Sequence, residues 1–424
     1  MPSFNVYWMV IGASLIIIFS YGYNALARKT NIPSVLMLIV TGFILSLFFE
    51  LDDEGLTPVL KFLGTVGLIM IVLEAALDLH LDREKAGLIT KSFFIALALL
   101  ALTSFAIAMV LRFFFETTSF TAMVYAIPLA IMSSAIIIPS VANLSEHKKE
   151  FLVFESAFSD IAGIMFFNFL LDSAKFSGAA EISVNVAGNI LLTLVIAIVF
   201  GYIIIVLIQR IDAEVKLFLP IATLLLLYAV GQLFHLSSLI FILAFGLMLN
   251  NHQLFFRGPL KRYILPKAFR TLLSELKLIT LESSFLIRTF FFIVFGMSIT
   301  LDGFTSASVF LIALLALAAI YGLRFFALKV VTPKQLEPAL YIAPRGLITI
   351  LLFYKIPEEL MITGFSEGTL LLVILISSLI MMYGLIKNKS EEAKTGELEA
   401  PPVEASLAAG TSLEDLSLPT DAEE

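Results

Sequence analysis

Long apolar runs are the feature that most constrains how this chain can fold. A helix that crosses a lipid bilayer needs about 20 mostly apolar residues. The sequence contains thirteen such segments, at residues 6–27, 32–49, 58–79, 91–113, 121–143, 150–171, 186–209, 216–233, 236–250, 283–300, 306–331, 337–357 and 367–387. We therefore predict an all-α polytopic membrane protein with about 13 transmembrane helices embedded in a lipid bilayer.

The composition excludes most other classes of protein. Of the 424 residues, 59% are hydrophobic and 14% are charged, whereas a soluble domain carries roughly 25% charged residues. The chain has no cysteine, which excludes disulfides, thiolate metal sites and thiol catalysis. Its four histidines lie far apart, and neither a His-Glu-x-x-His motif nor a nucleophile–base pair indicates an intramembrane enzyme. We expect no catalytic residues, no cofactor and no binding to nucleic acid.

The acidic charge is concentrated at the C-terminal end. Ten acidic residues and one lysine follow Ser390, so residues 391–424 carry −9, whereas the net charge of the whole chain is −7 and residues 1–390 carry +2. Prolines and a shortage of large apolar residues accompany this charge. Residues 391–424 are therefore predicted to form a disordered acidic cytoplasmic tail.

The basic residues between the segments indicate the orientation in the membrane. If the N-terminus lies outside, 20 basic residues fall in cytoplasmic connections and four in outer ones, namely Lys61, Arg112, Lys175 and Lys355. The positive-inside rule predicts this asymmetry. We expect an N-terminus outside, a cytoplasmic C-terminus and a location in a cell (inner) membrane. One long cytoplasmic connection, residues 251–282, is amphipathic and basic, which predicts an interfacial helix between two halves of the chain or, alternatively, a plain linker.

Few ionisable residues lie inside the apolar segments, where each costs at least about 2.5 kcal/mol at the bilayer centre. Asp160 is the most isolated: it lies ten residues into its segment, about 15 Å deep, and no basic residue lies within ten positions. A carboxylate at this depth needs a proton or a small cation to neutralise its charge. We predict that Asp160 binds one or the other, and the alternative is a protonated acid that only hydrogen-bonds a neighbouring helix.

The other intramembrane charges include a carboxylate and three arginines. Glu155 lies five residues before Asp160, and we expect Arg345 to be its partner in a buried structural ion pair, because an unpaired charge there is costly. Arg324 either joins this pair or extends to the cytoplasmic interface. Arg288 lies near the start of its segment and is expected to extend to the interface.

Two apolar segments contain helix-breaking residues. The twelfth segment carries Pro344-Arg345-Gly346 at its middle, and the fifth carries Ser133 and Ser134 before Pro139. Proline removes a backbone donor and glycine permits unusual dihedral angles. Non-helical backbone at membrane depth occurs only where protein or a water-filled cavity surrounds it. The breaks lie seven segments apart, an odd number, so the two helices enter from opposite faces, as in transporters built from inverted repeats with broken crossing helices.

In these motifs the chain resembles the monovalent cation:proton antiporter superfamily. The run from Phe154 to Asp160 is similar to the Glu-x-Glu-Ser-x-x-Asn-Asp stretch of the family's sixth helix, in which Asp160 matches the ion-binding aspartate and Glu155-Ser156 match the Glu-Ser pair. The other matching motifs are Pro344-Arg345-Gly346, Ser133-Ser134-Ala135 and the third-helix stretch Leu73-Glu74-Ala75-Ala76-Leu77-Asp78. The resemblance covers roughly residues 5–388.

The resemblance implies a sodium/proton antiporter-like fold and function. By analogy, residues of about 91–171 and 306–387 form an ion-translocating core, and residues of about 1–80 and 216–300 form a dimer bundle. The implied activity is exchange of a monovalent cation (Na⁺, or else K⁺ or Li⁺) for H⁺ by alternating access in a homodimer that serves pH homeostasis. The alternatives are a sodium-coupled organic-solute symporter of the same fold group and a passive channel.

The predicted ion site centres on an alkali cation at Asp160. Its set of cation- or proton-binding residues comprises Asp160, Ser156, Ser159, Ser133, Ser134 and Glu74; for Glu74, an interfacial acid is the alternative. The chain departs from the family at Ser159, where relatives carry Asn, Asp or Gln, and its first break lacks the acid of many sodium exchangers. A single carboxylate at the crossing predicts one proton per cation and electroneutral exchange.

Overall fold

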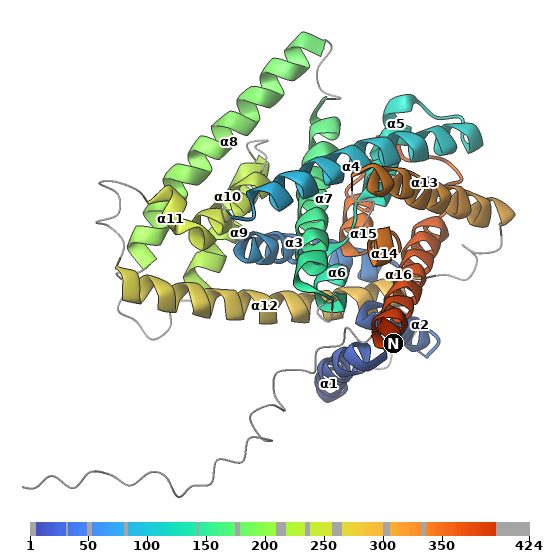
Figure 1. Ribbon diagram of the computed structural model, residues 1–424, viewed down its shortest axis with the longest axis horizontal. Coiled ribbons are helices and arrows are strands. Elements are labelled where there is room, and N and C mark those ends of the chain that lie inside the picture. Colours follow the sequence, from blue (N-terminus) through green and yellow to red (C-terminus); the bar gives the residue numbers. More distant parts are fainter. Residues whose placement is uncertain are drawn as a thin grey trace, which may run out of the picture.

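The described part of the computed structural model is helical. It comprises residues 6–30, 33–48, 53–79, 84–141, 144–173, 179–208, 218–233, 238–256, 265–299, 306–331 and 336–395. The regular elements in these ranges are α1 (Val6–Thr30), α2 (Ser34–Ser46), α3 (Asp53–Asp78), α4 (Ala86–Phe114), α5 (Ser119–Ala130), α6 (Ser134–Ser140), α7 (Glu146–Ser173), α8 (Ala179–Ile208), α9 (Phe218–Leu233), α10 (Ser238–Asn250), α11 (His252–Phe255), α12 (Pro266–Met297), α13 (Ala307–Val331), α14 (Leu336–Ala339), α15 (Leu347–Phe353), the 3₁₀ turn η4 (Glu358–Leu360) and α16 (Glu367–Thr395). The predicted all-α class is confirmed (Figure 1).

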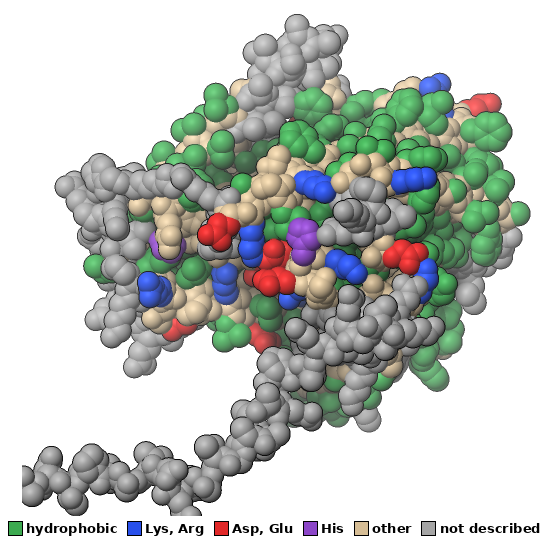
Figure 2. All heavy atoms as spheres, in the orientation of Figure 1, with side chains coloured by type: hydrophobic (Ala, Val, Ile, Leu, Met, Phe, Trp, Pro, Cys, Tyr) green, Lys and Arg blue, Asp and Glu red, His purple; other side chains and the backbone are tan. Residues whose placement is uncertain are grey.

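The helices present apolar surface outward, as a bilayer requires. Within the described ranges, seven helical stretches are long and apolar enough to cross a membrane, and four shorter apolar helices accompany them. Large side chains such as Phe113 (84% exposed) and Val330 (82% exposed) project from the protein. On the face shown in Figure 2, charged side chains gather in a band across the middle, and hydrophobic ones predominate toward the upper and right edges. An apolar surface this extensive is stable only in contact with lipid.

The helices pack into two bundles. The first, called here the crossing bundle, comprises α4–α7 and α13–α16, in which α4 packs on α5, α7 and α13, and α16 packs on α13 and α14. The second, the flanking bundle, comprises α1–α3, α8–α10 and α12, in which α12 packs on α2 and α3, and α10 on α3, α8 and α9. Figure 1 shows α8–α11 at one end of the molecule and α5 and α13–α16 at the other.

Helix α12 is longer than the sequence indicated. The predicted interfacial helix over 251–282, followed by a span over 283–300, is wrong: one continuous helix of 32 residues starts at Pro266 and ends at Met297. Proline at the first helical position suits a helix start, and the polar residues that follow keep helical spacing with apolar ones, so the helix does not end before the membrane. Its length is about 48 Å at 1.5 Å per residue, which exceeds the apolar thickness of a bilayer.

Two apolar segments are interrupted, as predicted. The fifth segment divides into α5 and α6, with extended backbone at 131–133, and the twelfth divides into α14 and α15, with non-helical backbone at 342–346. The first break lies just before Ser134, whereas Pro139 lies inside α6. At the C-terminal end, α16 continues to Thr395, so the first residues of the predicted tail are helical, because Glu, Ala and Lys favour helix. The rest of that predicted disordered tail, residues 396–424, lies outside the described residues.

Candidate functional site

The two breaks contact each other at the centre of the crossing bundle. The backbone N–H of Ser133 in the first break donates to the carbonyl of Pro344 in the second, at 3.0 Å. A Cβ atom on Gly346 would lie 2.6 Å from Ser133 Oγ and 2.9 Å from the side chain of Ile136. Only glycine allows the two backbones to approach this closely. The crossing therefore depends on the Ser133 and Gly346 pairing.

Side chains from the second break satisfy backbone groups freed in the first. Thr349 Oγ1 donates to the carbonyl of Pro128 at 2.8 Å, and Arg345 Nε donates to the carbonyl of Leu129 at 2.9 Å. Arg345 Nη1 also donates to the carbonyl of Ala343 at 2.7 Å. The carbonyls of Pro128 and Leu129 lie at the C-terminal end of α5, and that of Ala343 lies before α15. No helical N–H is available to them there. Arg345 thus serves the unwound backbone of both segments.

The buried ion pair joins Glu155 to Arg324, so the predicted Glu155–Arg345 pair is wrong. Arg324 Nη1 and Nη2 lie 2.6 and 3.0 Å from Glu155 Oε1 and Oε2, a bidentate arrangement. Both side chains are at most 3% exposed, and Arg324 Nε donates to the carbonyl of Ala339 at 2.8 Å. The guanidinium of Arg345 is occupied by the carbonyls of the breaks, which leaves Glu155 to the arginine of α13. Arg324 does not extend to the interface.

Asp160 lies at the crossing, on α7, with its side chain 2% exposed. Its Oδ2 atom accepts a hydrogen bond from the backbone N–H of Ser134 at 3.0 Å. This N–H is free because α6 begins at Ser134 and the helix offers it no internal acceptor. Asp160 Oδ1 has no hydrogen-bond partner within the described part of the chain. One oxygen of the carboxylate is therefore fixed and the other is open.

Three further serines predicted as ligands of the cation differ in whether their hydroxyl groups have hydrogen-bond partners. Ser133 Oγ is buried and has no hydrogen-bond partner among the residues that the structure describes. Ser159 Oγ accepts from the backbone N–H of Met132 at 3.0 Å, so it ties α7 to the first break. Ser156 Oγ donates to the carbonyl of Val153 in its own helix at 3.1 Å. Of these three serines, Ser133 is the one whose hydroxyl has no hydrogen-bond partner among the described residues.

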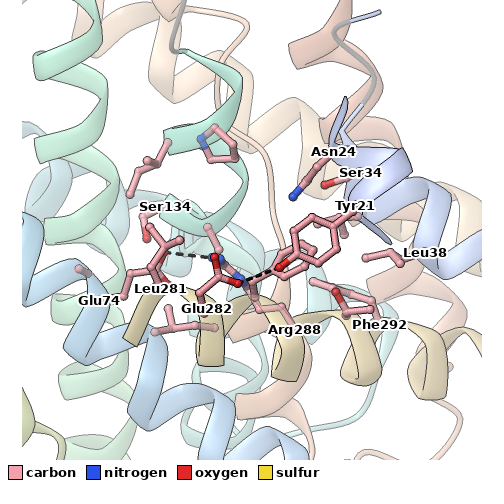
Figure 3. A pocket seen from close by; sticks show the side chains of 18 of the residues that line it. Tyr21, Asn24, Ser34, Leu38, Glu74, Ser134, Leu281, Glu282, Arg288 and Phe292 are labelled. Carbon is pink, nitrogen blue, oxygen red and sulfur yellow. Dashed lines mark hydrogen bonds and ion pairs between the residues drawn. The ribbon is translucent and has the colours of Figure 1, made fainter. Parts of the chain in front are cut away.

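A cavity of about 750 Å³ leads to this crossing between the two bundles. Its walls include Glu74 of α3, Arg288 of α12 and Ser134 of α6, the residue whose N–H holds Asp160. Glu74 Oε1 lies 3.5 Å from Arg288 Nη2, and Glu74 Oε2 has no hydrogen-bond partner in the described ranges. Figure 3 shows Glu74, Ser134 and Arg288 in this cavity together with Tyr21, whose hydroxyl donates to Glu282 at 2.8 Å. Glu74 therefore lines the cavity, with a side chain that is 13% exposed.

The position of Arg288 differs from the prediction. Because α12 begins at Pro266, Arg288 lies deep within the helix and its side chain is only 19% exposed. It turns toward Glu74 and does not extend to the interface. No motif in the sequence marks Thr349 as the residue that caps α5, although its place one turn after Gly346 is a usable signal. Recognising Pro266 as a helix start would have revealed the depth of Arg288.

The chain is similar to known proteins in its sequence family and in its fold. The chain matches the family model described as "Sodium/hydrogen exchanger, transmembrane" over residues 14–386. It is similar to the structure at pH 8 of the sodium proton antiporter MjNhaP1 from Methanocaldococcus jannaschii, with 20% identity, a TM-score of 0.64, and coverage of 90% of this chain and 96% of the other. An electron-microscopy structure of the same antiporter has 19% identity, a TM-score of 0.62, and coverage of 93% and 99%. No curated protein matches the sequence. The predicted antiporter-like fold is confirmed.

Proposed function

The chain belongs to the sodium/hydrogen exchanger family, and from this premise we propose that it exchanges Na⁺, K⁺ or Li⁺ for H⁺ at Asp160. Family membership supports cation:proton antiport in general. The observation that carries the finer proposal is the Asp160 carboxylate, with Oδ2 held by Ser134 N–H and Oδ1 open at the crossing of two broken helices. Such crossings supply ion sites in transporters built from inverted repeats.

In this proposal, Asp160 holds a proton or a cation but never both. A buried carboxylate is stable only when its charge is neutralised. A proton bonded to Oδ1 accomplishes this, and so does an alkali cation that reaches Oδ1 from the cavity. Ser133 Oγ and Glu74 Oε2, both buried without a partner among the described residues, are the further oxygen ligands that we assign to the cation. The backbone N–H of Ser134 donates to Asp160 Oδ2 and fixes the carboxylate. Ser159 Oγ accepts from the backbone N–H of Met132 and fixes the first break.

We assign alternating access to a movement of the crossing bundle against the flanking bundle. The Glu155–Arg324 pair joins α7 to α13, and Arg345 joins the two breaks, so the residues around Asp160 move as one body. The cavity of about 750 Å³ lies between α6 of the crossing bundle and α1, α2, α3 and α12 of the flanking bundle. In the orientation favoured by the basic residues, its α1 and α2 walls lie near the cytoplasmic ends of those helices.

Further proposals concern assembly, location and stoichiometry. We assign the flanking bundle to a homodimer contact in a cell membrane, with the N-terminus outside. Support comes from the resemblance to the antiporter superfamily, which implies that residues of about 1–80 and 216–300 form the dimer contact. Glu155 also lies beside the breaks but is paired with Arg324, whereas Asp160 forms no ion pair within the described residues. We therefore propose that one proton leaves for each cation that binds and that exchange is electroneutral.

Flux in proteoliposomes with a trapped pH indicator tests this function. Addition of Na⁺, Li⁺ or K⁺ outside should change the internal pH for at least one cation, and an imposed membrane potential should leave the rate unchanged. Asp160→Asn should abolish the response while the protein elutes as the folded species in size-exclusion chromatography. Exchange that persists in Asp160→Asn would overturn the assignment of the site, and no response to any of the three cations would overturn antiport.

A further inference from the structure

Arg288 is an unexpected residue on the wall of a cavity that a cation must enter. A guanidinium is always charged in proteins, and a fixed positive charge repels an arriving cation unless a nearby acid neutralises it. Arg288 and Glu74 are about equally buried, at 19% and 13% side-chain exposure, and both face the cavity that reaches Ser134. The cavity therefore places a permanent cation beside an acid to which we assign a role in cation binding.

The contact between Arg288 and Glu74 is loose. A single pair of atoms, Arg288 Nη2 and Glu74 Oε1, approaches to 3.5 Å, which is at the limit of a hydrogen bond. The Glu155–Arg324 pair in the same protein is bidentate, at 2.6 and 3.0 Å, and is almost fully buried. Glu74 Oε2 is left without a hydrogen-bond partner in the described ranges, and the hydroxyl of Ser284, also without one, lies on the adjacent helix α12. Glu155–Arg324 has the geometry of a permanent link, whereas Glu74–Arg288 has that of a pair that can open.

We propose that Arg288 is a tethered counter-cation that competes with the transported cation for Glu74 and thereby sets the apparent affinity of the exchanger. The inference rests on the proposed function, in which Glu74 is a ligand from the flanking bundle. With the cavity empty, the guanidinium neutralises Glu74. A cation that enters and binds between Glu74 and Asp160 displaces the guanidinium into the cavity, where Glu282 offers another carboxylate (Figure 3).

If Arg288 is a counter-cation, the apparent KM for the transported cation depends on the charge at position 288 and not on the size of the side chain. Removal of the tethered charge frees Glu74 for the cation, so the apparent KM for the cation falls and the maximal rate is retained. If Arg288 had a merely structural role, its removal would raise the KM, because loss of packing or of an ion pair would disturb Glu74 and weaken binding of the cation. Restoring a positive charge at the same position must raise the KM again.

The chain has no cysteine, which makes it a ready background for this test. Arg288→Cys is reconstituted into liposomes, and the concentration dependence of the cation-driven pH change is measured before and after treatment with two thiosulfonates. One reagent attaches an aminoethyl group, which restores a tethered cation, and the other attaches a neutral methyl group. Mass spectrometry verifies the extent of each reaction. Arg270→Cys is the matched control, because Arg270 is an exposed arginine of the same helix that does not line the cavity.

We expect the apparent KM of Arg288→Cys to be about fivefold below that of the unaltered protein, which corresponds to the strength of a weak ion pair. The aminoethyl adduct should return the KM to the unaltered value, the methyl adduct should leave it low, and Arg270→Cys should show neither effect. A KM that rises in Arg288→Cys, or that responds equally to both reagents, would overturn the proposal. An introduced thiol that reacts with neither reagent would also overturn it, since position 288 would then lie outside the aqueous cavity. In each of these cases the unaltered protein still exchanges the cation for protons. If the proposed function itself is wrong, the unaltered protein shows no exchange.

Discussion

At the scale of single residues, the chemistry of this protein depends on which buried polar atoms have partners. Asp160 Oδ2, Glu155 and Arg345 have hydrogen-bond partners, whereas Asp160 Oδ1, Ser133 Oγ and Glu74 Oε2 have none among the described residues. Buried polar atoms without partners are rare in folded proteins and call for an explanation. A proton or an alkali cation that visits these oxygens in turn is the explanation that fits an exchanger.

Replacement of Glu155 tests the role of the buried polar groups that have partners, which we expect to be structural. Glu155→Gln leaves Arg324 as an uncompensated buried charge, so we expect a loss of about 3–5 kcal/mol in the free energy of unfolding. Glu155→Gln combined with Arg324→Met should recover much of it, because replacement of both partners removes the unpaired charge. Thermal unfolding in detergent measures the effect, with Glu74→Gln as the control that changes stability far less. Equal unfolding temperatures for Glu155→Gln and the unaltered protein would contradict the pairing.

Single residues were also where the sequence was most informative about function. Asp160 stood out because no basic residue lies near it along the chain, and that isolation persists in the structure. The partner of Glu155 could not be found in the same way, because two arginines were available and sequence gives no register between helices. One of the two carbonyls that accept from the Arg345 guanidinium, that of Leu129, lies on α5, 216 positions away in sequence, and no local pattern indicates it.

At the scale of elements, the two interrupted helices position the backbone and side-chain groups around Asp160. Their breaks place Ser134 N–H against Asp160, Pro344 carbonyl against Ser133 N–H, and Arg345 against the carbonyl end of α5. Helix-breaking residues predicted both interruptions. The first break lies at 131–133, directly before Ser134, whereas Pro139 lies inside the short helix α6, where it removes the backbone donor that would otherwise reach the carbonyl of Ala135.

The close approach of the breaks predicts a strong effect of a single methyl group. Gly346→Ala places a Cβ 2.6 Å from Ser133 Oγ and 2.9 Å from Ile136 Cδ1, so the breaks must separate and Ser134 must move relative to Asp160. We expect exchange to fall at least about tenfold, since displacement of a binding group by a fraction of an ångström is that costly. The matched control is Gly322→Ala in α13, where a Cβ would meet nothing within 4 Å. Full activity of Gly346→Ala would show that the breaks are not tightly coupled.

At the scale of the whole molecule, few contacts join the two bundles. The clearest are α3 with α15, where a Cβ on Gly64 would lie 2.3 Å from the side chain of Leu351, and the bond from Lys355 Nζ to the hydroxyl of Tyr228 at 3.1 Å. Apolar segments predicted the order of the helices and, within the described ranges, roughly their number, because length and hydropathy indicate where a helix can cross a bilayer. Contacts between the bundles join segments that are distant in the chain, and no local sequence pattern predicts them.

Movement between the bundles predicts the effect of a covalent link. Gly64→Cys combined with Leu351→Cys joins the flanking bundle to the crossing bundle, and oxidation should stop exchange reversibly, with recovery on reduction. The control pair is Tyr341→Cys with Gly384→Cys, in which a Cβ on Gly384 would lie next to the Cβ of Tyr341 and both residues belong to the crossing bundle. That pair should remain active when oxidised. Unimpaired exchange by a fully cross-linked Gly64–Leu351 pair would contradict alternating access by movement of one bundle against the other.

Proton release on cation binding tests the central claim most directly. Purified protein in detergent is titrated with the transported cation in two buffers of different ionisation enthalpy, and the difference in heat gives the number of protons released for each cation bound. Competition at Asp160 predicts a number close to one at a pH where the carboxylate is protonated, and no release from Asp160→Asn. Cation binding that releases no proton from the unaltered protein, or the same number from Asp160→Asn, would contradict the claim that one carboxylate carries both ions.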